Sequence, residues 1–208
     1  MNRIFYYIGR LTSLLYPVWL HNKINIQLDK IYTWRIATSF KQFSGGSNTL
    51  IHRCIHVWNG KNITIGENIH IFKDSILACH PNSQHAKPEI IIGNDCEIGE
   101  YSHITCANRI TIGNNLFTGR RCTITDNSHG PSSRNVLDQN PRLRDIVSKG
   151  PVSIGNNVWL GDNVVILPGV TVGDGVIIGA NTVVTNNIPS YSVVVGNPMK
   201  IVKILKNG

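Results

Sequence analysis

The chain is poor in charged residues and lacks the features that mark several protein classes. Charged residues make up 15% of its 208 residues, against roughly 25% in typical globular domains. Its five cysteines include no CxxC pair, which favours reduced, structural thiols and a cytoplasmic location. The longest apolar stretch, Ile4–Leu20, is interrupted by Arg10 and Pro17, and no cleavage motif follows it. It therefore predicts neither a membrane span nor a signal peptide.

Glycine and β-branched residues are abundant instead. The chain has 19 glycines and 41% hydrophobic residues, and asparagine and isoleucine are also frequent. This composition argues against disorder and against a helix bundle. It predicts one domain rich in β structure and tight turns, with at most a small appendage.

The positive charge lies at the two ends of the chain. Residues 1–50 hold six basic residues and one acidic residue, residues 51–174 are balanced, and residues 175–208 hold three lysines and no acid. A protein that binds duplex nucleic acid would carry a basic stripe with a recognition motif, so no nucleic-acid partner is expected. The pattern suits two local anionic partners, such as a membrane surface and a small phosphorylated ligand.

Residues 1–46 differ from the rest, because most of the aromatic residues fall there. Apolar residues share one face of a helix, at Ile4, Ile8, Leu11, Leu15 and Val18. A second helix is expected from about Asp29, stopped by Gly45 and Gly46. Two interpretations stay open. The segment is a helical cap packed on the main domain or between subunits, or residues 1–45 contact an anionic membrane surface.

From about residue 47 to residue 208 a six-residue period replaces the helical one. Its clearest run is Ile154, Leu160, Ile166, Val172, Ile178 and Val184. Repeats this short indicate a solenoid, and the period predicts a triangular parallel β-helix of about six coils. Two insertions interrupt it, a short one near 80–89 and a long loop at 126–150. Such loops must leave the prism, and they often carry function.

The run PVSIGNNVWLGDNVVILPGVTVGDGVIIGANTVVTNNIPSYSVVVGNPMKIVKIL (Pro151–Leu205) resembles the hexapeptide-repeat acetyltransferases. It is most similar to the maltose/galactoside O-acetyltransferase branch and to the capsule and O-antigen O-acetyltransferases. The resemblance implies a left-handed β-helix, a homotrimer with active sites between subunits, and acetyl-CoA as acyl donor. It implies no metal ion.

The resemblance also assigns roles to individual residues. His129, in the motif TDNSHG, is implied as the general base. A sugar hydroxyl needs such a base, because it is a weak nucleophile at neutral pH. Asp126 either orients the imidazole of His129 or caps a turn. Trp159, in NNVWLG, is expected to face outward near the acceptor and the pantetheine arm. The implied contacts with CoA are Asp162, Ala180, Thr185, Asn186, Lys200 and Lys203.

Some residues depart from the pattern of the maltose/galactoside branch. Gly99 and Ala107 stand near the positions of its sugar-binding asparagine and aspartate, so the free sugars of that branch are not expected as acceptors. His80 and His85 share the spacing of part of the zinc site of γ-class carbonic anhydrases. In those enzymes a lone histidine precedes the pair, and they lack the GNPMK ending that this chain has. Contact with the acceptor or plain loop polarity is therefore expected of His80 and His85.

The predicted function is acetyl-CoA-dependent O-acetylation of a sugar hydroxyl on a polysaccharide, a lipid-linked glycan or a related saccharide. Two alternatives stay open. One is an antibiotic O-acetyltransferase, streptogramin-like, and the other is a non-catalytic β-helix scaffold. The expected location is the cytoplasm, peripheral to the inner face of the membrane.

Overall fold

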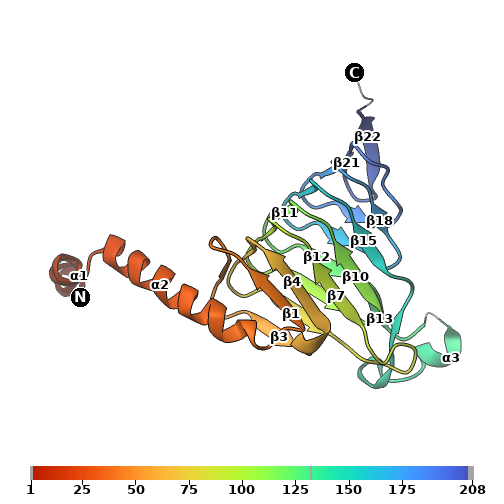
Figure 1. The fold of residues 1–208 in the computed structure, drawn as a ribbon, viewed down its shortest axis with the longest axis horizontal. Helices are drawn as coiled ribbons and strands as arrows, with labels where there is room; N and C mark the ends of the chain where they lie inside the picture. Colours follow the sequence, from red (N-terminus) through yellow and green to blue (C-terminus); the bar gives the residue numbers. More distant parts are fainter. Residues whose placement is uncertain (1, 132, 206–208) are drawn as a thin grey trace.

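The computed structural model describes residues 2–131 and 133–205. Over these residues the chain winds through three sheets that form the sides of a prism (Figure 1). The first sheet contains β1 (Gln42–Gly45), β4 (Ile63–Glu67), β7 (Glu89–Ile92), β10 (Arg109–Ile112), β15 (Val152–Ile154) and β18 (Thr171–Val172).

The other two sheets are built in the same way. The second contains β2 (Leu50–Ile51), β5 (His70–Ile71), β8 (Glu97–Ile98), β11 (Phe117–Thr118), β16 (Trp159–Leu160), β19 (Ile177–Ile178), β21 (Ser192–Val195) and β22 (Lys200–Ile204). The third contains β3 (His56–Trp58), β6 (Ile76–Cys79), β9 (His103–Cys106), β12 (Thr123–Thr125), β17 (Val165–Ile166) and β20 (Val183–Val184). Neighbouring strands within these sheets are parallel, except that β22 runs antiparallel to β21. The predicted β fold with parallel sheets is confirmed.

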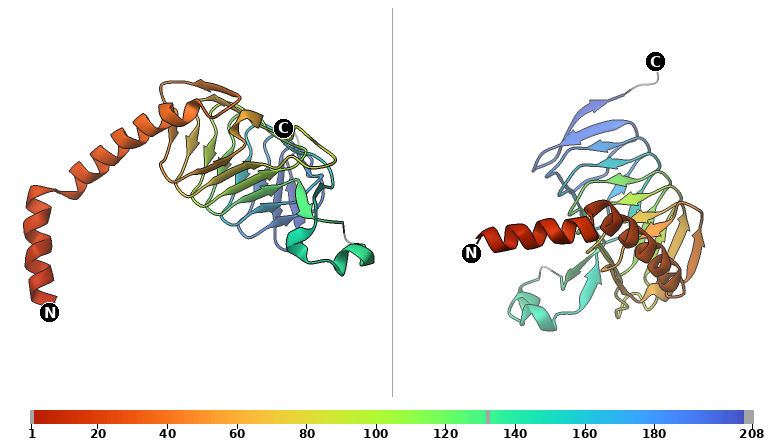
Figure 2. Two further views of the ribbon diagram at one scale, coloured as in Figure 1. Left: turned by 90° about the horizontal axis from the view of Figure 1, so that it is seen from below. Right: turned by 90° about the vertical axis from the view of Figure 1, so that its left-hand side faces the viewer.

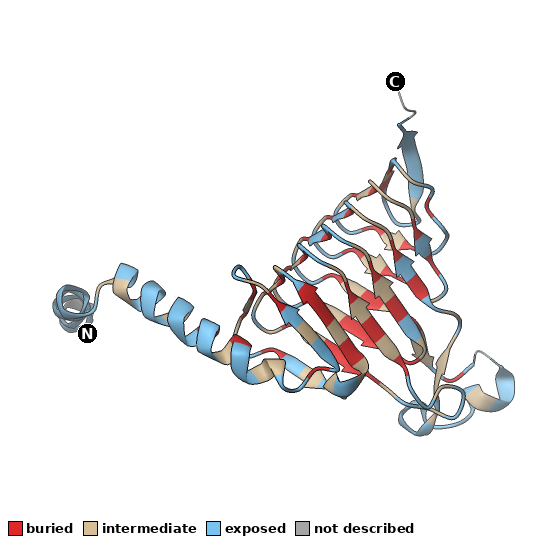
Figure 3. Cartoon of the chain, viewed as in Figure 1, coloured by how far each residue is buried: buried red, intermediate tan, exposed pale blue. Residues whose placement is uncertain are grey.

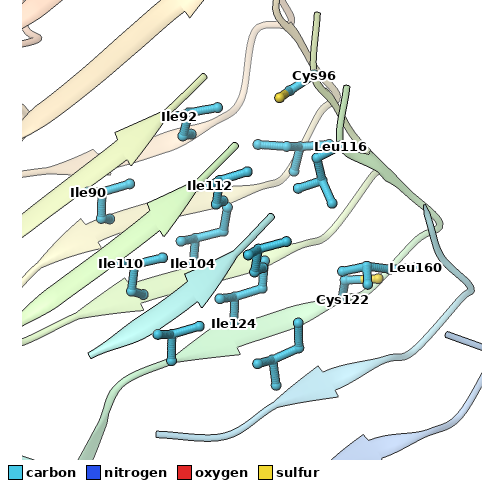
Figure 4. Close-up of a cluster of buried hydrophobic side chains, with 14 of the residues drawn as sticks. Ile90, Ile92, Cys96, Ile104, Ile110, Ile112, Leu116, Cys122, Ile124 and Leu160 are labelled. Carbon is cyan, nitrogen blue, oxygen red and sulfur yellow. The ribbon is translucent and has the colours of Figure 1, made fainter. Parts of the chain in front are cut away.

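The repeat residues form the core of the prism. Ile92 pairs in register with Ile65 in the coil before it and with Ile112 in the coil after it, and all three are at most 1% exposed. A second inward row lies two residues before the first, and the six-residue period did not reveal it. It includes Ile69 and, labelled in Figure 4, Ile90, Cys96, Ile110, Leu116 and Cys122. Each strand and the corner before it therefore supply two core side chains.

The cysteines of the chain are unpaired, as expected for structural thiols. Cys79, Cys96, Cys106 and Cys122 are buried, and Cys54 is exposed. Burial raises the pKa of the Cys96 thiol and raises that of Cys122 to about 11. A thiol held protonated is a poor nucleophile and metal ligand, so these buried side chains act as small apolar groups.

The corners between the first and second sheets are joined by a ladder of side-chain hydrogen bonds. The Asn94 side-chain oxygen accepts from the backbone N–H of Glu67, and that of Asn114 accepts from the N–H of Asn94, at 2.9 and 2.8 Å. The Asn156 side chain accepts from the N–H of Asn114 in turn, at 2.9 Å. Asparagine suits these corners because its side chain reaches the backbone of the next coil.

Two helices precede the prism. Pro17 separates α1 (Asn2–Leu15) from α2 (Val18–Ala37), and α1 stands clear of the sheets (Figures 1 and 2). The last turns of α2 cover the exposed edge of the first coil. There the Thr33 hydroxyl accepts from the N–H of Ile51 at 2.8 Å and donates to the carbonyl oxygen of Asp29, one turn earlier in α2, at 2.8 Å. A side chain thus replaces the neighbour that an edge strand lacks.

The second helix ends earlier than the glycine pair at 45 and 46 predicts. It ends at Ala37, because the following residues join the prism: β1 pairs in parallel with β4, with Phe43 opposite Ile65. Phe43 also stacks on buried Phe40, with ring centroids 6.1 Å apart. The first strand of the prism therefore lies inside the segment 1–46.

Candidate active site

The long insertion leaves the prism after β12, at the edge between the third and first sheets. It contains the strands β13 (Asn127–His129) and β14 (Ile146–Ser148), the short helix α3 (Arg134–Leu137) and a 3-10 turn at Pro141–Leu143. The two strands pair antiparallel, with His129 opposite Ile146. Figures 1 and 2 show this ribbon projecting from the prism. His129 is exposed at the outer end of β13.

Asp126 fixes the root of this ribbon. Its carboxylate is fully buried and accepts from the backbone N–H groups of Ala107, Asn108 and Arg109 at 2.6, 2.8 and 2.8 Å. Among the described residues, it has no hydrogen bond to His129. Of the two roles predicted for Asp126, turn capping accounts for its contacts, because its oxygens serve the turn of the preceding coil.

Further bonds tie the ribbon to the rest of the edge. The Asn127 amide donates to the carbonyl oxygen of Thr105 at 3.0 Å. The N–H of Ser148 donates to the side-chain oxygen of Gln84 at 3.3 Å. The short insertion near 80–89 thus contacts the long one, although many residues separate them in the chain. His129 is therefore carried by a hairpin that is braced at both strands.

His80 belongs to the same edge, and the sequence did not single it out as a partner of His129. Its backbone N–H donates to the carbonyl oxygen of Cys106 at 2.7 Å, which places it beside the turn that Asp126 caps. Burial and then the positive charge of His129 lower the pKa of His80, while the charge of Asp126 acts in the opposite direction. The alignment of neighbouring coils could have predicted this position. Cys79 pairs with Cys106, so the residues that follow these two cysteines lie on the same edge.

His103 and His85 differ in their positions relative to this edge, because His103 is at the opposite end of β9 from Cys106. His103 begins β9, and burial together with the charge of His80 lowers its pKa. His85 lies in the short insertion, where its N–H donates to the side chain of Asn82 at 2.9 Å. Within residues 2–131 and 133–205, no three His, Cys, Asp or Glu side chains gather in a way that could hold a metal ion.

Trp159 and Asp162 lie on another part of the prism. Trp159, on β16 of the second sheet, is 50% exposed while the next residue, Leu160, is fully buried. It stands beside Phe117 of β11. Asp162 is at the corner between the second and third sheets, where it accepts from the N–H of Arg120 at 2.8 Å. Asp162 and Phe117 also line a cavity of about 260 Å³.

The remaining predicted CoA contacts are divided between the edges. Ala180 is exposed at the corner one coil beyond Asp162. Thr185 and Asn186 follow β20, on the same edge as His129, and are exposed. Lys200 and Lys203 are exposed on β22 in the second sheet. Within one chain, the predicted residues therefore occupy two edges and one face, and do not form a single cluster.

Comparisons with known proteins agree with this architecture. Residues 151–186 match the family model described as bacterial transferase hexapeptide (six repeats). The chain is 38% identical over 121 residues to an Escherichia coli K12 protein named as a lipopolysaccharide biosynthesis O-acetyl transferase, WbbJ. The match covers 55% of this chain and 60% of that relative's length, so the chain spans only part of it.

Two solved structures share the fold. One is AntD, an N-acyltransferase from Bacillus cereus, in complex with dTDP and 3-hydroxybutyryl-CoA. Its TM-score is 0.64 at 22% identity, covering 79% of this chain and 84% of that one. The other is a maltose O-acetyltransferase from Clostridium difficile 630, with a TM-score of 0.50 at 28% identity, covering 83% and 73%. The resemblance to hexapeptide-repeat acetyltransferases is confirmed.

Proposed function

We propose that this chain is an acetyl-CoA-dependent O-acetyltransferase. Its acceptor is a sugar hydroxyl of a polysaccharide, a lipid-linked glycan or a related saccharide. The named O-acetyl transferase and maltose O-acetyltransferase among its relatives support this reaction class. The hand of the coil that we infer from the same resemblance is left.

The observation that carries the proposal is the position of His129. It is an exposed imidazole at the end of a ribbon whose root is fixed by a fully buried carboxylate. A general base must reach a proton on a substrate outside the fold, yet it must be held in place. A histidine on a braced hairpin meets both needs better than one on a flat sheet.

The reaction follows from this placement. His129 removes the proton of the acceptor hydroxyl while the hydroxyl oxygen attacks the thioester carbonyl carbon. The resulting tetrahedral oxyanion collapses, the carbon–sulfur bond breaks, and the thiolate of CoA takes the proton from His129. The products are an acetyl ester and free CoA, and the base returns to its starting state.

The residues assigned to CoA fit a ligand with a long neutral arm and a phosphorylated head. Ala180 adds only a methyl group to an exposed corner, which leaves the backbone accessible. Lys200 and Lys203 supply positive charge for phosphate groups. Thr185 and Asn186 lie on the edge of His129, but Ala180 lies on another edge and the two lysines lie on the second sheet. We therefore propose that neighbouring subunits of a homotrimer bring His129 and the remaining CoA contacts together.

An acetyl-transfer assay on the intact protein tests the proposal. Wild-type protein should transfer acetyl from acetyl-CoA to members of a saccharide panel, and His129→Ala should lower kcat about 10²–10⁴-fold with CoA affinity nearly unchanged. His56→Ala, at an exposed histidine that begins β3 in the first coil, is the matched control and should keep activity. Circular dichroism checks the fold of each variant.

The same assay separates the alternatives. Transfer to a macrocyclic antibiotic but to no saccharide would identify the streptogramin-like reaction. Absence of both transfer and acetyl-CoA hydrolysis would leave a β-helix scaffold. Normal turnover in a folded His129→Ala variant would remove His129 from the mechanism.

A further inference from the structure

The first helix presents an apolar surface that the rest of the chain does not cover. Its aliphatic and aromatic side chains and that of Tyr16 are 46–77% exposed, at Ile4, Phe5, Tyr6, Tyr7, Ile8, Leu11, Leu14, Leu15 and Tyr16. Figure 3 shows α1 and most of α2 as exposed, and Figure 2 shows α1 clear of the prism. An apolar surface of this extent marks an interaction site.

The apolar arc of α1 is broad. Successive side chains turn by about 100° around a helix, so the apolar ones from Leu14 through Leu11 to Phe5 cover about half of the circumference. Arg10 and Ser13 lie on the opposite side, and Tyr6 lies between them. A helix that packs against another in a coiled coil needs only a narrow seam of two positions in seven. Such a seam would also not continue along α2, because Asn22 and Asn25 occupy the positions that would follow Val18 in a seven-residue repeat.

The hydroxyl groups of Thr12 and Ser13 are paired within α1. The Thr12 hydroxyl donates to the carbonyl oxygen of Ile8 at 2.9 Å, and that of Ser13 donates to the carbonyl oxygen of Arg10 at 2.8 Å. Hydroxyls that bond to their own helix leave no unpaired donor when the helix is buried.

We infer that α1 and the start of α2 bind the surface of an anionic lipid bilayer. Residues 4–28 contain Arg10 and Lys23 but no acidic residue, which complements negative headgroups. Tyr7, Tyr16 and Trp19 are of the types that favour the membrane–water boundary. An amphipathic helix with these features lies in the plane of the membrane surface.

The helix lies on the membrane and does not cross it. With 14 residues, α1 is about 21 Å long, short of the hydrocarbon thickness of about 30 Å. In the part of the chain that the structure describes, no helix is long and apolar enough to span a bilayer.

The anchoring of α2 connects this surface to the prism. Asp29, buried in α2, accepts from the Arg53 side chain at 2.8 Å and pairs with His52 at 2.9 Å. The Arg53 guanidinium also donates to the Asn25 side chain at 2.7 Å. Membrane binding by α1 would therefore hold the first coil near the lipid. This inference does not depend on the proposed acetyl transfer.

Vesicle co-sedimentation with the full chain tests the inference. Wild-type protein should bind vesicles that contain phosphatidylglycerol. It should bind pure phosphatidylcholine about tenfold less at the same salt concentration, because Arg10 and Lys23 then have no anionic headgroups to attract them. Leu11→Glu should lower binding about 10- to 100-fold, the effect of removing one buried leucine. Ser13→Glu adds the same charge on the opposite side of α1 and is the matched control, which should keep most of the binding.

Two results would overturn the inference. One is wild-type protein that does not bind anionic vesicles. The other is a Leu11→Glu variant that binds vesicles normally but has a smaller mass by light scattering, which would show that α1 packs against a second copy of the chain. Both substitutions lie on a helix outside the prism, so circular dichroism should show the same β-helix in each.

Discussion

At the scale of single residues, His70 on the second sheet links the stability of the fold to pH. The rings of His52, His70 and Phe72 form a cluster, with the centroid of His70 5.3 Å from that of His52 and 4.5 Å from that of Phe72, and those of His52 and Phe72 5.1 Å apart. Burial, and then the charge of His52, lower the pKa of His70, while Glu97 acts in the opposite direction. The neutral form of His70 is therefore the one that the folded chain accommodates.

This environment predicts a loss of stability in mild acid. Since the folded pKa of His70 lies below its unfolded value near 6.5, the unfolded chain binds more protons in that window. The contribution of His70 to the free energy of unfolding is therefore fully present above about pH 6.5, and it falls as the pH drops toward the folded pKa. Thermal unfolding from pH 7.5 to 5 should show a decline that His70→Gln reduces but His21→Gln, on the exposed part of α2, does not. Equal pH slopes in both variants would contradict this account.

Lysines on β22 should affect CoA binding without affecting the chemical step. Lys200→Ala and Lys203→Ala should weaken CoA binding, more at low salt than at high salt, and change kcat far less than His129→Ala does. The reason is that their positive charges attract the CoA phosphates equally in the ground state and in the transition state. Titrations with CoA at two ionic strengths measure the effect. A fall in kcat with unchanged CoA affinity would assign these lysines another role.

At the scale of elements, the corners of the prism determine which substitutions it tolerates. A Cβ on Gly93 would lie 2.6 Å from the carbonyl oxygen of Gly113 in the next coil. No rotamer change relieves a contact with backbone, so the coils would have to separate. Gly9 on α1 has no atom within 4 Å of the corresponding point.

These two glycines form a matched pair of variants. Gly93→Ala should lower the free energy of unfolding by about 1–3 kcal/mol. Gly9→Ala should leave the unfolding of the prism unchanged, because alanine is favoured in helices and meets no neighbour there. Urea unfolding of both variants makes the comparison, and an unaffected Gly93→Ala would mean that adjacent coils pack less tightly than described.

The repeat predicted the stacking of the core but not the details at its ends. Ile65, Ile92 and Ile112 could be aligned from their spacing, because a six-residue period repeats one environment. The end of α2 at Ala37 could not, because it depends on the pairing of β1 with β4, far along the chain. The contacts of Asp126 with the 107–109 turn likewise depend on the neighbouring coil.

At the scale of the whole molecule, the distribution of the candidate site is the main finding. His129, Thr185 and Asn186 lie on the edge between the third and first sheets, whereas Asp162 and Ala180 lie on the edge between the second and third. The sequence could assign these residues by resemblance, but it could not show that one prism keeps them apart. An assembly would complete the site if it placed the edge between the third and first sheets of one copy beside the edge between the second and third sheets of another.

A mixed-oligomer experiment tests most directly the central claim, that acetyl transfer uses His129 of one subunit and the CoA edge of its neighbour. His129→Ala removes the base, and Ala180→Trp blocks the CoA corner, so each variant alone should be nearly inactive. After the two are unfolded together in equal amounts and refolded, about a quarter of the sites in a cyclic oligomer would pair one intact base with one intact CoA edge. We predict that the mixture regains about a quarter of wild-type acetyl transfer. A mixture no more active than its parents, with mixed oligomers shown by mass spectrometry, would contradict a site shared between subunits.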